Sequence, residues 1–218
     1  MSVLKICNVI DLHTAKVLDK LNVEFIGIHM INEFKTYKLK LLQRCISELK
    51  YTIPVVVTSV KKIDYLRDLS TFNIPYLQLH AYINRDELKE IKNLLPDSSI
   101  ICVVNISPTS DTNEILSYIN NIKNLIDFIL FDKPYVNRGK DPINYKLLYE
   151  ILNNDNFPKH TRYFIGGGLT INNVIKYLEL HPYGIDIQTG VEKSDGVKDF
   201  NKIKTLLKIM DRVETINL

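Results

Sequence analysis

Apolar residues in this chain gather in eight short runs that are rich in β-branched and aromatic side chains. Most of the runs are nearly continuous in apolar residues, which is typical of parallel strands covered on both faces. The runs lie at 4–7, 25–30, 54–59, 76–80, 99–105, 128–132, 162–166 and 184–188. This pattern predicts eight buried strands in one parallel sheet.

Segments with helical spacing lie between these runs, at 37–50, 143–152, 170–180 and 197–210. In the first of them one apolar stripe consists of Leu39, Leu42, Cys45, Ile46 and Leu49. Regular alternation of strands and helices predicts an α/β protein with a single (β/α)8 TIM barrel domain over residues 1–218. Alternation alone does not close a barrel, so an open doubly wound sheet is the structural alternative.

Composition supports one ordinary globular domain. The chain has 218 residues, of which 45% are hydrophobic and 24% charged, and this argues against disorder. Its formal net charge of +3 is spread along the sequence, which is too weak to predict nucleic acid as a partner. The composition leaves a monomer and a homodimer equally open.

Cysteine usage and hydropathy predict a cytoplasmic protein. The three cysteines are an odd number, with no CxxC pair and no spacing typical of metal ligands, which fits a reducing compartment. We therefore expect neither a disulfide framework nor a metal site. The first residues lack the apolar core of a signal peptide, and no apolar stretch is long enough to span a bilayer, so no membrane partner is expected.

Glycine-bearing turns follow the last two predicted strands and predict a phosphate site. The first turn contains Gly167 and Gly168, and the second contains Thr189 and Gly190. Glycine lets backbone N–H groups approach an anion closely, and the loops after strands seven and eight are the usual phosphate site of this barrel. Each turn alone could simply be a tight turn, but together they favour phosphate.

Cys7 and Asp132 close the first and sixth predicted strands, where side chains face the mouth of a barrel. A thiol with a pKa of about 8.5 needs only a modest electrostatic push to act as a base near neutrality. A carboxyl group at the edge of an apolar strand can stay protonated and act as a general acid. The alternatives are a small core residue for Cys7, and a helix cap or an ion pair with Lys133 or Lys140 for Asp132.

Histidines and the other cysteines are less informative. His80 follows the fourth predicted strand, where it could contact substrate or Cys7, although a structural role is equally compatible with its position. His29 could point to either face of its strand and is left unassigned. Cys45 and Cys102 fall on a helical stripe and inside a strand, and we interpret both as core residues.

These residues resemble the phosphoribosylanthranilate isomerase family of tryptophan biosynthesis. The similar segments run in order from one end of the chain to the other and are LKIC at 4–7, YLQLHA at 76–81, ILFDK at 129–133, RGKDPINY at 138–145, FIGGGLTINNV at 164–174 and GIDIQTGVEKSDGVKD at 184–199. The last two are specific to the family.

The resemblance implies an Amadori rearrangement without a cofactor, in which an N-(5-phosphoribosyl) amine becomes a 1-amino-1-deoxyribulose 5-phosphate. It implies that Cys7 takes a proton from the C2 carbon of the sugar and that Asp132 protonates the ring oxygen. It also assigns the phosphate to Gly167, Gly168, Thr189 and Gly190. The expected partner is therefore a small sugar phosphate.

The chain departs from the family pattern at three positions. Asn8 and Ala81 stand where the family usually has glycine, and Thr36 stands where the family carries an arginine that helps to hold the aromatic amine. Lys35 or Lys38 could replace that arginine, although an ammonium does not reproduce its bidentate geometry. Two alternatives therefore remain, namely a paralogue that isomerises another phosphoribosyl amine and a barrel that binds a phosphorylated ligand without catalysis.

Overall fold

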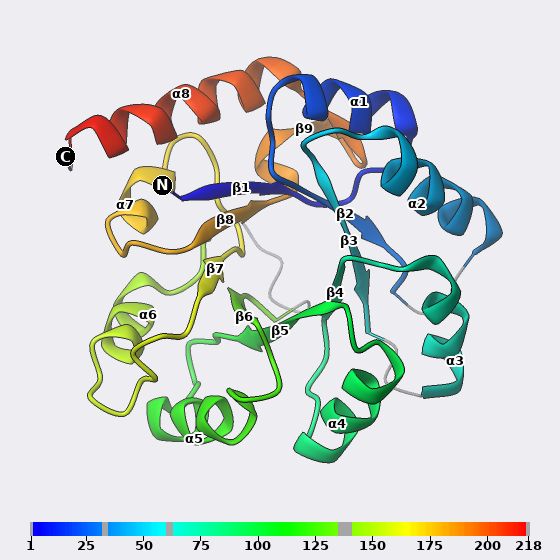
Figure 1. Ribbon diagram of the computed structural model, residues 1–218. Coiled ribbons are helices and arrows are strands. Elements are labelled where there is room, and N and C mark those ends of the chain that lie inside the picture. Colours follow the sequence, from blue (N-terminus) through cyan, green and yellow to red (C-terminus); the bar gives the residue numbers. More distant parts are fainter. Residues whose placement is uncertain (1, 32–34, 60–62, 135–140, 217–218) are drawn as a thin grey trace.

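Eight parallel strands close into a barrel in the computed structural model, which describes residues 2–31, 35–59, 63–134 and 141–216 (Figure 1). The strands are β1 (Val3–Ile6), β2 (Phe25–His29), β3 (Ile53–Thr58), β4 (Tyr76–Leu79), β5 (Ser99–Asn105), β6 (Phe128–Asp132), β7 (Tyr163–Ile165) and β8 (Gly184–Ile187). Each strand pairs with the next, and β1 pairs with β8. The predicted (β/α)8 barrel is confirmed, and the open sheet is excluded.

Helices surround the barrel on the outside (Figure 1). They are α1 (Leu12–Lys20), α2 (Thr36–Glu48), α3 (Ile63–Arg67), α4 (Arg85–Leu94), α5 (Thr112–Ile122), α6 (Tyr145–Leu152), α7 (Val174–Leu178) and α8 (Phe200–Ile216), with a 3-10 turn η1 (Asp68–Phe72) after α3. Several helices begin where a side-chain oxygen accepts hydrogen bonds from the first free N–H groups, as at Asp11, Asn84 and Asp111. The polar residues between the apolar runs therefore fix where these helices start.

The predicted stripe of α2 is only partly correct. Leu42 and Cys45 are buried as expected, but Leu41 joins them and Ile46 is 36% exposed. The apolar arc of this helix is wider than one stripe, so packing against the sheet decides which part of the arc faces inward.

The segment expected to form a helix from 197 begins instead with a hairpin. Strands β9 (Glu192–Ser194) and β10 (Val197–Lys198) pair in antiparallel orientation before α8 starts. Gly196 turns the chain between them with a φ of 75°, a conformation that favours glycine. The helix expected over 170–180 is likewise shorter, because Asn173 closes a turn onto Thr170 before α7.

An aromatic cluster fills the amino-terminal end of the barrel interior. Phe25, Phe128 and Phe164 are at most 3% exposed, and Phe25 meets Tyr76 and Phe164 edge to face at 5.0 and 5.8 Å between ring centroids. Such packing leaves little space at this end. Polar side chains and open volume are therefore left for the carboxyl ends of the strands.

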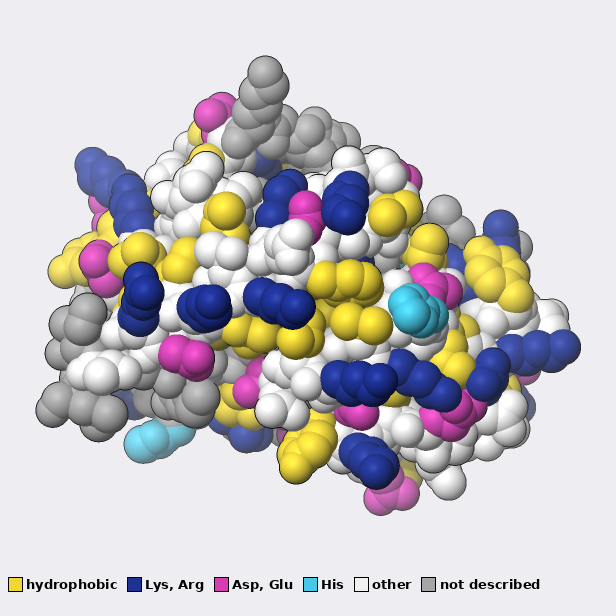
Figure 2. All heavy atoms as spheres, turned by 90° about the horizontal axis from the view of Figure 1, so that it is seen from above, with side chains coloured by type: hydrophobic (Ala, Val, Ile, Leu, Met, Phe, Trp, Pro, Cys, Tyr) yellow, Lys and Arg dark blue, Asp and Glu magenta, His cyan; other side chains and the backbone are white. Residues whose placement is uncertain are grey.

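Figure 2 shows the molecule from the side that carries α8 and α1. Lys and Arg side chains spread over this face with acidic side chains between them, so the small net charge does not concentrate there. Across the residues described, none of the helices combines the length and the apolar character that crossing a bilayer requires.

Candidate active site

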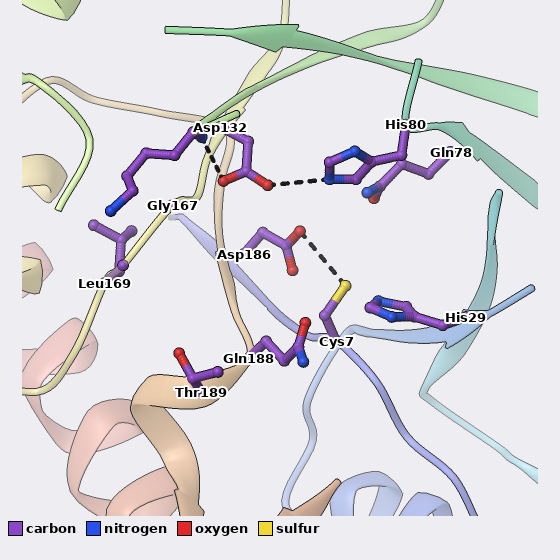
Figure 3. A pocket seen from close by; sticks show the side chains of 12 residues that line it. Cys7, His29, Gln78, His80, Asp132, Gly167, Leu169, Asp186, Gln188 and Thr189 are labelled. Atoms are coloured by element: carbon purple, nitrogen blue, oxygen red, sulfur yellow. Dashed lines mark hydrogen bonds and ion pairs between the residues drawn. The ribbon is translucent and has the colours of Figure 1, made fainter. Parts of the chain in front are cut away.

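A cavity of about 170 Å³ opens at the carboxyl ends of the strands. Side chains from β2, β4, β6 and β8 and from the residues that follow β1, β4, β6, β7 and β8 surround it (Figure 3). The lining residues are Cys7, His29, Gln78, His80, Asp132, Lys133, Gly167, Gly168, Leu169, Asp186, Gln188 and Thr189. Segments far apart in the sequence thus converge on one site.

Cys7 and Asp132 face this cavity from different strands of the ring (Figure 3). Asp132 ends β6, and its carboxylate accepts a hydrogen bond from the backbone N–H of Lys133 at 2.7 Å. The other carboxylate oxygen lies 3.4 Å from Nε2 of His80, and both side chains are about one fifth exposed. The acid, the thiol and the histidine expected at the site therefore share one cavity.

Two buried charges surround the thiol of Cys7. The Lys5 ammonium donates to Cys7 Sγ at 2.8 Å and to Asp186 Oδ2 at 3.0 Å, and Sγ lies 3.6 Å from the same carboxylate oxygen. Burial and the Asp186 carboxylate raise the pKa of the Cys7 thiol to about 12, while Lys5 acts in the opposite direction. From the sequence, we expected a modest lowering of the thiol pKa to make Cys7 a base near neutrality. Burial instead raises the pKa of Cys7, so the resting thiol is a weaker acid than we expected.

The two glycine-bearing turns meet at the other side of the cavity. Gly167 and Gly168 adopt φ values of 78° and 81°, so a side chain at either position would strain the backbone. Gly190 leaves no space for a side chain, because a Cβ there would lie 2.0 Å from the carbonyl oxygen of Leu169. Gly167, Gly168 and Thr189 line the cavity, whereas Gly190 holds the two turns together from behind.

Two buried oxygen atoms at the cavity have no hydrogen-bond partner among the residues described, Gln78 Oε1 and Asp186 Oδ1. Gln78 is 1% exposed and Asp186 is 8% exposed. A buried acceptor without a donor costs about 1–3 kcal/mol, so such atoms call for a ligand or water. Gln78 and Asp186 therefore place two unsatisfied acceptors in the wall of the cavity.

Lys35 and Lys38, the residues expected to hold the amine half of a substrate, are not among the residues that line the cavity. Lys35 is exposed at the N-cap of α2 and does not line the cavity. The Lys38 ammonium donates to the backbone carbonyl of His29. The loop residues 32–34 and the segment 138–140, which includes Lys140, lie outside the described residues.

Sequence reasoning missed three residues of the site, namely Lys5, Gln78 and Asp186. Each is a polar residue inside an apolar strand, and Lys5 precedes Cys7 by two positions, so both side chains point into the barrel. A polar residue two positions from Cys7 in the same strand could therefore have been predicted to lie beside its thiol. Cys45 and Cys102, by contrast, are buried free thiols in the core, as predicted.

A metal ion has no obvious place in the part of the chain that the structure describes. Within it, no three His, Cys, Asp or Glu side chains are grouped so that they could hold one. The thiol, the carboxyl group and the imidazole at this cavity can transfer protons, and the glycine-bearing turns beside them have backbone N–H groups suited to an anion.

Comparison with known proteins agrees with this geometry. The family model described as N-(5'phosphoribosyl)anthranilate (PRA) isomerase matches residues 4–209. A relative of that name from Crocosphaera subtropica is 26% identical and covers 96% of this chain and 98% of its own length. Another, from Lachnoclostridium phytofermentans, is 29% identical over 93% of this chain and 94% of its own.

Solved structures share the fold. The phosphoribosyl anthranilate isomerase from Thermus thermophilus has a TM-score of 0.78 at 17% identity, over 97% of this chain and 99% of that one. A phosphoribosyl anthranilate isomerase in complex with reduced 1-(o-carboxyphenylamino)-1-deoxyribulose 5-phosphate has a TM-score of 0.74 at 20% identity, over 97% and 99%. Because the family model spans nearly the whole barrel, this chain belongs to the N-(5'-phosphoribosyl)anthranilate isomerase family.

Proposed function

We propose that this protein isomerises N-(5-phosphoribosyl)anthranilate to 1-(o-carboxyphenylamino)-1-deoxyribulose 5-phosphate, a step of tryptophan biosynthesis. The observation that carries the proposal is the convergence of Cys7 and Asp132 on one cavity beside two glycine-bearing turns. Family membership and the ligand named for one solved relative support the same reaction.

In the proposed reaction Asp132 gives a proton to the ring oxygen of the ribose. The bond between that oxygen and C1 breaks, and the nitrogen lone pair forms a C1–N double bond. Cys7 loses its thiol proton to solvent, and the resulting thiolate takes the proton from C2; the C–H electron pair forms a C1–C2 double bond, and the C1–N electrons return to nitrogen. The resulting enol becomes the ketone, so the overall change is an isomerisation that consumes no cofactor.

The anchor for the substrate is proposed at the phosphate end. Backbone N–H groups at Gly167 and Gly168 and the Thr189 hydroxyl would hold the phosphate, with Gly190 keeping the turns in contact. Gln78 Oε1 and Asp186 Oδ1, which have no donor among the described residues, would accept hydrogen bonds from sugar hydroxyls once the substrate is bound. His80 would contact the substrate and orient Asp132, from which it lies 3.4 Å.

Turnover of the purified protein tests this assignment. We expect consumption of N-(5-phosphoribosyl)anthranilate by the wild type, and a loss of about 10²–10⁴-fold in kcat for both Cys7→Ala and Asp132→Asn, because each removes a proton-transfer group. Cys45→Ala is the matched control, since that thiol lies in the core and should leave kcat unchanged. Near wild-type activity in either site variant contradicts the role of that residue.

A second candidate keeps the chemistry and changes the amine. The observation that favours it is Thr36 at the position of the family arginine. Growth of a tryptophan auxotroph that lacks the isomerase separates the two, because a paralogue would not restore growth. If Lys35 binds the anthranilate carboxylate, Lys35→Met raises KM without lowering kcat.

A barrel that binds a phosphorylated ligand without catalysis is the remaining alternative, and it predicts no turnover of any phosphoribosyl amine.

The oligomeric state and the cellular location of the protein are proposed from its relatives and its cysteines. A solved phosphoribosylanthranilate isomerase from Thermotoga maritima is described as dimeric, with monomers made from it. We propose a monomer or a homodimer here, to be decided by sedimentation. The three free cysteines suit a reducing compartment, which supports a cytoplasmic location.

A further inference from the structure

Lys5 is a charged side chain sealed inside the barrel. It is 1% exposed and lies in β1 two positions before Cys7. A lysine is almost never fully buried unless it is paired, because desolvation of the ammonium is costly. An apolar residue would fill this position at lower cost. The charge at Lys5 therefore calls for a role beyond packing.

The partners of Lys5 are two acids of the site. Its ammonium lies 2.8 Å from Cys7 Sγ and 3.0 Å from Asp186 Oδ2, and those two acceptors are 3.6 Å apart. The barrel creates this triangle, because β1 pairs with β8 in a register that places Lys5 opposite Asp186. One cation thus faces both a thiol and a carboxylate.

We propose that Lys5 is a positioning residue of the reaction, whose ammonium directs Cys7 Sγ into the cavity and favours its thiolate, while Asp186 opposes it. The proposal rests on the function proposed above, in which Cys7 removes the C2 proton. The thiolate forms by release of the thiol proton to solvent. It then takes the proton from C2 to regenerate S–H, as the C–H electron pair forms the C1–C2 double bond.

The charges around the sulfur act with opposite signs. Burial and the Asp186 carboxylate raise the pKa of Cys7 to about 12, whereas the charge and hydrogen bond of Lys5 lower it. Burial by itself lowers the pKa of Lys5, but Asp186 and Cys7 raise it overall, so the amine stays protonated. Lys5 thus keeps its positive charge next to Cys7 Sγ at neutral pH.

Other ionisable groups face the cavity of Cys7 from neighbouring elements. They are His29 on β2, His80 after β4, and Asp132 and Lys133 at the end of β6. Lys198 on β10 does not line the cavity, but it donates to the Cys7 carbonyl and pairs with Glu192. Because Lys5 is the cation that donates to Sγ, the test changes Lys5 and Asp186 and leaves this surrounding set constant.

The experiment measures how fast iodoacetamide alkylates Cys7 as a function of pH, with peptide mass spectrometry to read each cysteine separately. In Lys5→Met we expect the labelling of Cys7 at a fixed pH to slow by about tenfold or more, since one pKa unit changes the thiolate fraction tenfold. In Asp186→Asn we expect it to accelerate by a similar factor. Cys45 and Cys102 are internal controls, because these core thiols react only if the protein unfolds.

Opposite responses of the two variants support the proposal. Changes in the same direction, or unchanged labelling in both, overturn it, because a purely structural pair would loosen the site in either variant. If Lys5→Met does not fold, which the labelling of Cys45 reveals, the double variant Lys5→Met/Asp186→Asn removes the uncompensated carboxylate. Its Cys7 must then label more slowly than in Asp186→Asn alone, and equal or faster labelling overturns the proposal.

Enzyme kinetics separate this proposal from the proposed function. We expect kcat of Lys5→Met to be at least tenfold reduced at pH 7 and to recover as pH rises, because more of the thiol ionises. A wild type that labels as expected but turns over no substrate refutes the isomerase function alone. An active wild type whose Cys7 labelling and pH profile do not respond to Lys5 refutes the role of Lys5 alone.

Discussion

At the residue scale, departures from the family pattern have local explanations. Asn8, which directly follows Cys7, has a φ of 58°, a left-handed conformation that asparagine tolerates better than most residues other than glycine. Ala81 is absent from the residues with positive φ in the described chain, so its Cβ causes no backbone strain there. Both substitutions are therefore compatible with the geometry around the site.

Asn8 gives a stability prediction. Asn8→Ala should lower the free energy of unfolding by about 1–2 kcal/mol, because alanine is strained in the left-handed region, whereas Asn8→Gly should cost much less. Denaturant unfolding measures both. Asn113→Ala is the control, since that residue is exposed and helical. Equal losses in the alanine and glycine variants of Asn8 would show that its side chain, and not its backbone conformation, matters.

At the element scale, the turns after β7 and β8 form one unit. The second turn begins with the 3-10 segment η3 (Thr189–Val191), and Gly190 in it packs directly on the backbone at Leu169. This contact places Thr189 and the glycines of the first turn along one side of the cavity. The glycine motif in the sequence signals the turns, but their mutual contact depends on the neighbouring positions of β7 and β8 in the barrel.

Gly190→Ala should separate the two turns, because its Cβ would lie 2.0 Å from the Leu169 carbonyl oxygen. If the turns bind phosphate, KM for the phosphorylated substrate should rise at least about tenfold, and inhibition by inorganic phosphate should weaken in parallel. Gly196→Ala is the matched control, because it strains a glycine in the β9–β10 hairpin and should lower stability without raising KM. An unchanged KM in Gly190→Ala argues against a phosphate site between the turns.

At the scale of the whole molecule, a buried lysine of the β9–β10 hairpin connects the two ends of the chain. The side chains of Lys198 and Glu192 are 0% and 5% exposed and 2.5 Å apart. Lys198 also donates to the backbone carbonyl of Cys7. The β9–β10 hairpin thereby fixes the end of β1, and Val197 and Lys198, which were predicted as helix, form its second strand instead.

Lys198→Met should lower the free energy of unfolding by about 3–5 kcal/mol, because it leaves the Glu192 carboxylate buried without its partner. The double variant Lys198→Met/Glu192→Met should recover most of that loss. Lys89→Met is the control, since its ion pair with Asp86 is exposed and should contribute nothing measurable. Additive losses in the double variant would mean that the two side chains are not coupled.

The sequence alone determined parallel strands covered by helices, since continuous apolar runs alternate with amphipathic segments, and the count of eight runs favoured a barrel, but closure of the sheet was shown only by the structure. It also located Cys7, Asp132 and the glycine turns, because the residues that end parallel strands lie together at one end of the barrel. Tertiary structure decided the rest. Lys5 and Asp186 are 181 positions apart, and only closure of β1 onto β8 brings their charges together at the thiol. The local sequence determines which side chains of a strand point to the same side. The burial and the charges around a side chain such as Cys7 depend instead on residues from distant strands, which only the closed barrel brings next to it.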